Sequence, residues 1–212
     1  ASVQHDKLID IAGVVEHAAL WLLRQGRLSF DQIARLAPAV EHLASVVGDL
    51  LPADERALLG RRVARLRAAG VPQPLAERVG GIIFLTTAFE IGDLAARSGQ
   101  ANDRAAQTFY GVGARFALDE LRDAARRMPA ETSWQKTAVE TLIDDFYALQ
   151  ADLAERVLKA ADGAADPIAF WVAAHADRLG PAEAIAAELR VAPSPDLAML
   201  VVAGRQLRQA LA

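Results

Sequence analysis

The feature that most constrains this chain is the stretch Trp134–Ala160, the longest run in the sequence without a proline or a glycine. Its apolar residues recur in steps of three and four, a spacing that places them on one face of an α-helix. They are Trp134, Ala138, Leu142, Phe146, Leu149, Leu153 and Val157, and Val139 and Ile143 widen the stripe. Thr132 and Gln135 have the spacing of a capping box, and Gly163 follows the end. The sequence predicts a central helix that is buried along Leu142, Phe146, Leu149 and Leu153.

Proline and glycine divide the rest of the sequence into further segments with helical patterns. We expect helices over Val3–Gln25, Phe30–Ala37 (capped by Ser29), Pro38–Leu51, Pro52–Ala69, Leu75–Ser98, Arg104–Ala117 (with Asp103 as its cap), Leu118–Met128, Asp166–Leu179, Ala182–Arg190 and Asp196–Leu211. A break is expected at Gly180-Pro181, and Gly80, Gly81 and Gly92 predict a kink or a close helix crossing. The run Gly80–Thr87 is rich in strand-forming residues but lies inside a helical pattern, so we interpret it as buried helix. The predicted fold is all-α, an irregular multi-helix bundle of about 8–10 helices.

A chain of 212 residues can form one large domain or two small ones. We expect residues 1–212 to form a single helical domain, with a possible subdomain break near residues 71–74, where Pro72 and Pro74 lie in a connector. The chain starts with Ala1 and runs almost directly into a helical pattern, so we expect it to be part of a longer protein.

Composition excludes several classes of function. The formal net charge of −4 gives no electrostatic reason to expect nucleic acid or an anionic membrane surface as a partner. The sequence has no cysteine, which excludes disulfides and thiolate sites and is consistent with a reducing cytoplasm. Charged residues near the start, such as Asp6 and Lys7, exclude an uncleaved signal peptide, and the longest uncharged apolar stretch, Val79–Phe89, is too short to span a bilayer. We therefore expect a cytoplasmic protein.

Glycines and histidines provide the first candidates for chemistry. The segment Gly111–Phe116 begins like a dinucleotide-binding loop, but it lacks the third glycine and no strand precedes it. We therefore predict that Gly111 and Gly113 serve helix packing. The four histidines, His5, His17, His42 and His175, do not have the spacing of metal ligands.

Charged residues provide the remaining candidates. The adjacent acids Asp119-Glu120 and Asp144-Asp145 point in different directions on a helix, so a solvated face or a salt bridge is favoured over acid–base catalysis. The basic stretch from Arg56 to Arg67, with Arg61, Arg62 and Arg65, is interpreted as a solvated helix face, although it could contact phosphate or an acidic partner. The three lysines, Lys7, Lys136 and Lys159, lack a context that would activate an amine. The sequence predicts no catalytic, cofactor-binding or metal-binding residue.

Several segments together resemble one known family. The segment Thr108–Arg122 has an aromatic–glycine–Arg pattern that runs into Leu118-Asp119-Glu120-Leu121-Arg122. Trp134-Gln135, Asp144–Gln150 and Val157-Leu158 follow in order, and Trp21–Arg24, Gly70–Pro72, Leu75-Ala76 and Ala88–Ile91 precede them. This combination resembles the C-terminal region of the large bacterial NAD-specific glutamate dehydrogenases, with Glu120 at a position where that family usually has tryptophan.

The resemblance implies a parent enzyme that converts L-glutamate and NAD to 2-oxoglutarate, ammonia and NADH. It implies that the dinucleotide-binding and catalytic segments lie upstream, so NAD belongs to the parent and no cofactor belongs to this segment. The implied role is assembly, interdomain contact or regulation, with the upstream domains of the same chain as partners and a homo-oligomeric parent. The alternatives are a freestanding helical interaction module, which would bind a partner helix in a groove, and, with less support, an independent small-molecule enzyme.

A segment taken from a larger enzyme is expected to leave exposed the apolar residues that its partner covers. The first and last predicted helices carry more apolar residues than one packing face uses. In the first helix these are Val14, Leu20 and Leu23, and in the last they are Leu197, Met199, Leu200, Val201, Val202 and Leu207. We predict an exposed apolar strip on one of these helices, or its burial by self-association.

Overall fold

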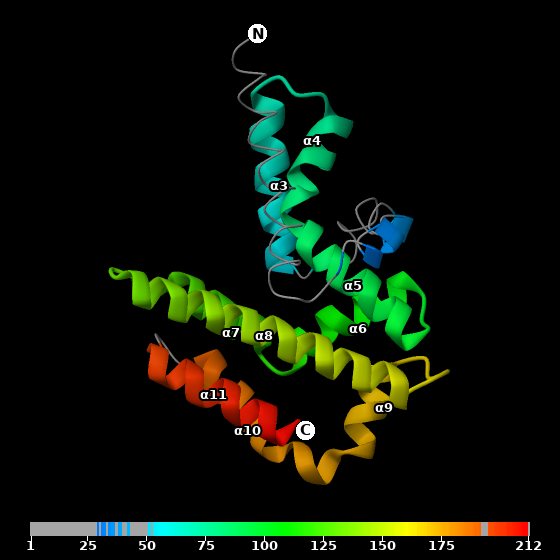
Figure 1. The fold of residues 1–212 in the computed structure, drawn as a ribbon, viewed down its shortest axis with the longest axis vertical. Helices are drawn as coiled ribbons and strands as arrows, with labels where there is room; N and C mark the ends of the chain where they lie inside the picture. Colours follow the sequence, from blue (N-terminus) through cyan, green and yellow to red (C-terminus); the bar gives the residue numbers. More distant parts are fainter. Residues whose placement is uncertain are drawn as a thin grey trace. The chain divides into compact units, whose positions relative to one another are not determined.

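The computed structural model describes residues 51, 53–191 and 195–211, and between residues 29 and 42 it describes 29, 31, 32, 34–36, 38, 39 and 42 (Figure 1). The described residues from 53 to 211 form nine α-helices and one 3₁₀-helix, those from 31 to 42 are also helical, and no strand occurs among the described residues. The predicted all-α fold is confirmed. The expected helix Val3–Gln25 lies outside the described residues, as do His5, His17 and Lys7.

The chain divides into two compact units, Ala1–Ala106 and Gln107–Ala212. Within the first unit, residues 69–72 connect α3 (Ala53–Ala68) to α4 (Gln73–Gly81), with the turn at Ala69 and Gly70. The possible break near residues 71–74 therefore falls between two packed helices of one unit. The single domain over residues 1–212 stays a prediction.

In the first unit, Gly80 lets α4 cross α3 closely. A Cβ atom on Gly80 would lie 2.9 Å from Val63 Cγ2 and 3.3 Å from Leu59 Cδ1. After Gly81 the chain forms the 3₁₀-helix η1 (Ile82–Phe84) and continues as α5 (Leu85–Ser98). The strand-rich run is therefore helical, and the predicted interruption at the paired glycines is confirmed. The helix α4 starts at Gln73, before the predicted Leu75, since Pro74 fits its first turn.

The start of α6 (Asn102–Arg115) differs from the prediction. We expected Asp103 to cap this helix, but the helix already includes Asn102, so Asp103 lies in its first turn. There the Asp103 carboxylate accepts a hydrogen bond from His42 Nε2 at 3.0 Å. An acidic residue in the first turn also interacts favourably with the helix dipole, so the position stabilises the helix without being its cap. The Ser29 prediction is confirmed, because its Oγ accepts from the backbone N–H of Gln32 at 3.3 Å.

The second unit is organised around α8 (Ser133–Ala160). Figure 1 shows α8 alongside α7 (Leu118–Arg127), with α11 (Leu197–Ala210) packed against α7, α8 and α10. The capping box is present, with the Thr132 side chain accepting from the Gln135 backbone and the Gln135 side chain accepting in return. The four residues predicted to be buried, Leu142, Phe146, Leu149 and Leu153, are buried.

Trp134 does not join the buried part of the stripe. Trp134 is 82 % exposed, because it lies in the first turn of α8 and the residues that α11 covers lie further along that helix. Helical periodicity predicts the face of the helix on which a side chain lies. Burial also requires a neighbouring helix that packs against that face at the same position along the helix axis.

The break between the next two helices was predicted at the wrong place. The helix α9 (Pro167–Ala174) ends at His175, and α10 (Ala176–Val191) runs through Gly180 and Pro181. Proline removes one backbone hydrogen bond, but Leu179, Ala182 and Ala186 are buried along one face of α10, and this packing holds the helix together across Pro181.

Candidate functional site

A buried polar cluster joins α6, α7 and α8 in the second unit. The Arg122 side chain is 2 % exposed, and its guanidinium donates to the Asp119 carboxylate and to Gln150 Oε1. Gln150 is itself fully buried and donates through Nε2 to the Phe109 carbonyl at 2.7 Å. The Tyr147 ring lies 4.3 Å from the Arg122 guanidinium carbon, a cation–π distance. The cluster compensates the charge that it buries, which is the condition for a buried arginine to be tolerated.

The two glycines of the Gly111–Phe116 segment make room for this arrangement. A Cβ atom on Gly113 would lie 2.7 Å from both Asp119 Oδ1 and Gln150 Nε2. A Cβ atom on Gly111 would collide with Ile168 at the start of α9. Their predicted role in helix packing is confirmed.

A neighbouring arginine on α7 is more exposed. Arg126 donates to the Tyr147 hydroxyl at 2.8 Å and to Asp123 at 2.9 Å. Burial alone lowers the pKa of Arg126, but the charge and hydrogen bonds of Tyr147 and Asp123 outweigh it, so the pKa is raised and the guanidinium stays charged. A group that is always protonated does not act as a general acid or base near neutral pH.

The corner between α6 and α7 is held by a residue from α10. Arg190 donates through Nη2 to the carbonyls of Ala114 and Arg115, at 2.6 and 3.3 Å, and its Nε lies 3.3 Å from Glu120 Oε1. These carbonyls belong to the last turn of α6, where a cation is favoured. Asp119 and Glu120 are therefore both in salt bridges, which agrees with the prediction for adjacent acids.

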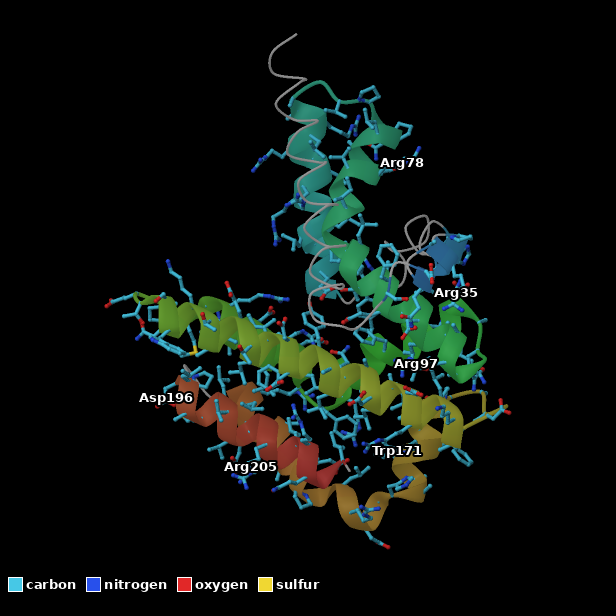
Figure 2. The ribbon with its side chains drawn as sticks, in the orientation of Figure 1. Arg35, Arg78, Arg97, Trp171, Asp196 and Arg205 are labelled. Atoms are coloured by element: carbon cyan, nitrogen blue, oxygen red, sulfur yellow. The ribbon has the colours of Figure 1, made fainter. Side chains whose placement is uncertain are left out.

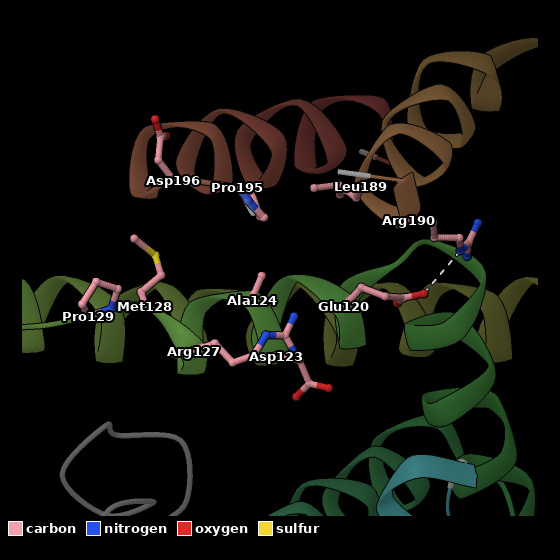
Figure 3. Close-up of a pocket in the computed structure, with 10 residues that line it drawn as sticks. All are labelled: Glu120, Asp123, Ala124, Arg127, Met128, Pro129, Leu189, Arg190, Pro195 and Asp196. Carbon is pink, nitrogen blue, oxygen red and sulfur yellow. Dashed lines mark hydrogen bonds and ion pairs between the residues drawn. The ribbon is translucent and has the colours of Figure 1, made fainter. Parts of the chain in front are cut away.

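A hollow of about 620 Å³ opens beside this corner (Figure 3). It is bounded by α7, by the end of α10 and by the start of α11. Its lining is Glu120, Asp123, Ala124, Arg127, Met128, Pro129, Leu189, Arg190, Pro195 and Asp196. Figure 3 shows Glu120 joined to Arg190 at one end of the hollow, while Asp196 lies at the other end, where it caps α11 by accepting from Met199 N at 2.8 Å. Asp123 also lines the hollow and pairs with Arg126, so each of these three carboxylates has a structural partner.

Some of the remaining candidates lie in structural contacts, and the others are exposed on helix surfaces. His175 stacks on Trp171 with ring centroids 4.4 Å apart, and Asp145 lies 3.9 Å from Arg208. Lys159 pairs with Glu155 at 2.6 Å. The arginines at 61, 62, 65 and 67 are exposed along α3, and Lys136 is exposed on α8. In the part of the chain that the structure describes, no group of three or more metal-ligating side chains is placed to hold an ion, and no helix is long and apolar enough to cross a membrane.

An apolar groove runs between α8 and α11. It measures about 470 Å³ and is lined from α8 by Trp134, Thr137, Ala138, Thr141, Leu142, Asp145 and Phe146, and from α11 by Val201, Gly204, Arg205 and Arg208. Beside it Met199, Val201 and Val202 are each about half exposed, at 51, 50 and 52 %. The exposed apolar strip predicted for the last helix is therefore present. Trp134, which also lines the groove, is 82 % exposed, so an exposed apolar surface surrounds the groove.

Comparisons with known proteins agree with the sequence resemblance. A family profile described as "Glutamate dehydrogenase, C-terminal" matches residues 1–209. The NAD-specific glutamate dehydrogenase of Pseudomonas aeruginosa is 28% identical over 213 residues, covering 98% of this chain and 13% of that protein. Those of Halomonas elongata and Mycobacterium tuberculosis are 29% and 27% identical, covering 82% and 95% of this chain. The chain spans 11% and 13% of the length of these two proteins. The chain belongs to the glutamate dehydrogenase C-terminal family.

Proposed function

We propose that this chain is a non-catalytic helical segment of an NAD-dependent glutamate dehydrogenase, and that it holds the upstream part of the same protein in the assembled enzyme. The parent reaction converts L-glutamate and NAD to 2-oxoglutarate, ammonia and NADH. The relatives that support this proposal are several times longer than the chain. Most of the parent protein is therefore available as a partner for its surface.

The observation that carries the proposal is the apolar groove between α8 and α11. Trp134 and Val201 both line it and both are exposed, whereas Leu142, Phe146, Leu149 and Leu153 of α8 are buried. Tryptophan is enriched among the hot spots of protein–protein interfaces. Asp145, Arg205 and Arg208 add charged groups at its border, as at the polar rim of an interface.

The first experiment tests the absence of catalysis. The purified chain is incubated with NAD and L-glutamate, and NADH is followed by its absorbance. We expect no turnover, because the sequence has no glycine-rich loop that would cradle the phosphates of NAD and no lysine in a context that would activate an amine. Turnover by the pure chain would contradict the proposal.

The second experiment tests the groove. Binding of the chain to the separately produced upstream part of the parent protein is measured for the wild type and for Val201→Asp, which places a charge in the groove. We expect the substitution to weaken binding about tenfold or more, since a charge that becomes buried at an interface without a partner is costly. Leu75→Asp is the matched control, because Leu75 is equally exposed, at 52 %, on α4 and does not line the groove. Equal affinities for the wild type and Val201→Asp would assign the contact to another surface, and a failure of both proteins to bind would favour a freestanding interaction module.

A further inference from the structure

A second hollow in the same unit is lined by basic side chains. Arg156 and Lys159 reach it from α8, Arg178 from α10, and His175 from the junction between α9 and α10. Its volume is about 460 Å³, within the range of small-molecule sites. The rest of the lining is Ala160, Trp171, Leu179 and Leu211, so no acidic side chain is among the described residues that line it.

The arginines and the lysine that line the hollow each have several N–H donors. An ammonium has three and a guanidinium has five. Lys159 pairs with Glu155 at 2.6 Å, and Arg156 donates through Nη1 to the Leu211 carbonyl at 2.8 Å. Arg156, Lys159 and Arg178 are cations at neutral pH and no acidic side chain of a described residue lines the hollow, so its lining is positively charged.

The floor of the hollow is rigid and apolar. Trp171 is 5 % exposed, and its ring packs edge-on against Phe116 at 6.3 Å between centroids. The His175 ring stacks on the Trp171 ring, and His175 Nδ1 lies 2.8 Å from the Trp171 carbonyl oxygen. Figure 2 shows Trp171 in the part of the unit where α9 meets the C-terminal half of α8. An apolar floor lowers the local dielectric constant and so strengthens the attraction of the cations for an anion.

We propose that this hollow binds the phosphate group of a small phosphorylated molecule. Cations that enter from α8 and from α10 approach a ligand from different directions. A tetrahedral phosphate can accept hydrogen bonds from all of them and carries up to two charges, whereas a carboxylate accepts mainly in one plane. The proposal concerns a ligand of this chain and does not depend on the role of the α8–α11 groove.

The experiment uses Trp171 as the reporter. The sequence has three tryptophans, so replacing Trp21 and Trp134 by phenylalanine leaves Trp171 as the only indole. Pyrophosphate is titrated into this variant at low salt, and the emission of Trp171 is followed. Titration calorimetry of the wild-type chain gives the same affinity without any substitution. We expect saturable binding that weakens as salt is added, because the contacts are charged and partly exposed.

Matched variants locate the site. Arg178→Gln and Lys159→Gln should each weaken pyrophosphate binding about tenfold or more, since each removes a charge-assisted contact. Arg78→Gln removes the same charge on α4, outside the hollow, and should bind as the wild type does; Figure 2 labels Arg78. Melting curves of the variants establish that they are folded. The proposal is overturned by the absence of saturable binding, by an equal loss in Arg78→Gln, or by succinate binding as tightly as pyrophosphate, which would assign the hollow to carboxylates.

Discussion

The packing of Phe146 of α8 against Gly204 of α11 gives a quantitative test of the core. Phe146 is 1 % exposed, and a Cβ atom on Gly204 would lie 2.6 Å from Phe146 Cε1 and 3.4 Å from its Cζ. Phe146→Ala removes a buried ring and should cost about 3–5 kcal/mol of unfolding free energy. For a chain of this size, that cost corresponds to a fall in melting temperature of about 6–20 °C.

The effect of Gly204→Ala on the free energy of unfolding should change sign with the residue at position 146. In the wild type, the added methyl group overpacks the ring at a cost of about 1–3 kcal/mol, and the better helix propensity of alanine returns about 1 kcal/mol. In the Phe146→Ala background the methyl group enters vacated space, so the same substitution should stabilise the chain. The expected coupling energy is roughly 1–3 kcal/mol.

Urea unfolding of the wild type, the two single variants and the double variant measures this coupling. Gly60→Ala is the control, because a Cβ atom on Gly60 of α3 meets nothing within 4 Å. Its effect should be the same with phenylalanine or alanine at position 146. If the costs of Phe146→Ala and Gly204→Ala simply add, the two helices do not approach each other as described, and the reasoning about the core is refuted.

Three further substitutions test the second unit, each by the same unfolding measurement. Gly113→Ala places a methyl group among the atoms that hold Arg122. It should destabilise the chain by about 3–5 kcal/mol, the range for breaking a buried ion pair. A neutral effect would contradict the buried cluster. Ala117→Gly should stabilise the chain by up to about 1 kcal/mol, because Ala117 has φ +57° and glycine adopts this conformation without penalty. A loss of stability would argue against the left-handed turn. Thr132→Ala removes the cap of α8 and should cost about 1 kcal/mol, whereas Thr132→Ser should cost less, and equal costs would count against the capping hydrogen bond.

The sequence predicted the helices well where local chemistry determines them. The capping box at Thr132 and Gln135 and the glycine that follows α8, Gly163 with φ +77°, were both visible in the sequence, since each depends on residues within a few positions. Pro181 was misread, because the packing that keeps α10 continuous comes from residues distant in the sequence. The exposure of Trp134 was missed for a similar reason, since periodicity along α8 does not say where a neighbouring helix stops.

The buried cluster was missed although the sequence contained a signal for it. Arg122 follows Leu118 by four positions and precedes Ala125 by three, so it occupies the apolar face of α7. Gln150 occupies the same kind of position in the stripe of α8. A polar residue on the buried face of each of two neighbouring helices indicates that they are partners. The basic hollow was beyond sequence reasoning, because its cations come from helices separated by a turn and an intervening helix.

The contacts of Arg190 also affect the order in which parts of the second unit fold during synthesis on the ribosome. Its donors satisfy the carbonyls of Ala114 and Arg115 at the end of α6, which lie 76 and 75 residues earlier in the chain. While the ribosome is still making α7 or α8, those carbonyls have only water as a partner. They lie in the last turn of α6, where no further backbone N–H of the helix reaches them, and Arg190 has not yet been synthesised. The corner between α6 and α7 therefore reaches its final form only when α10 has emerged. A nascent chain stopped within α8 should exchange the amide hydrogens of this corner quickly, even though all residues of α6 and α7 are already present.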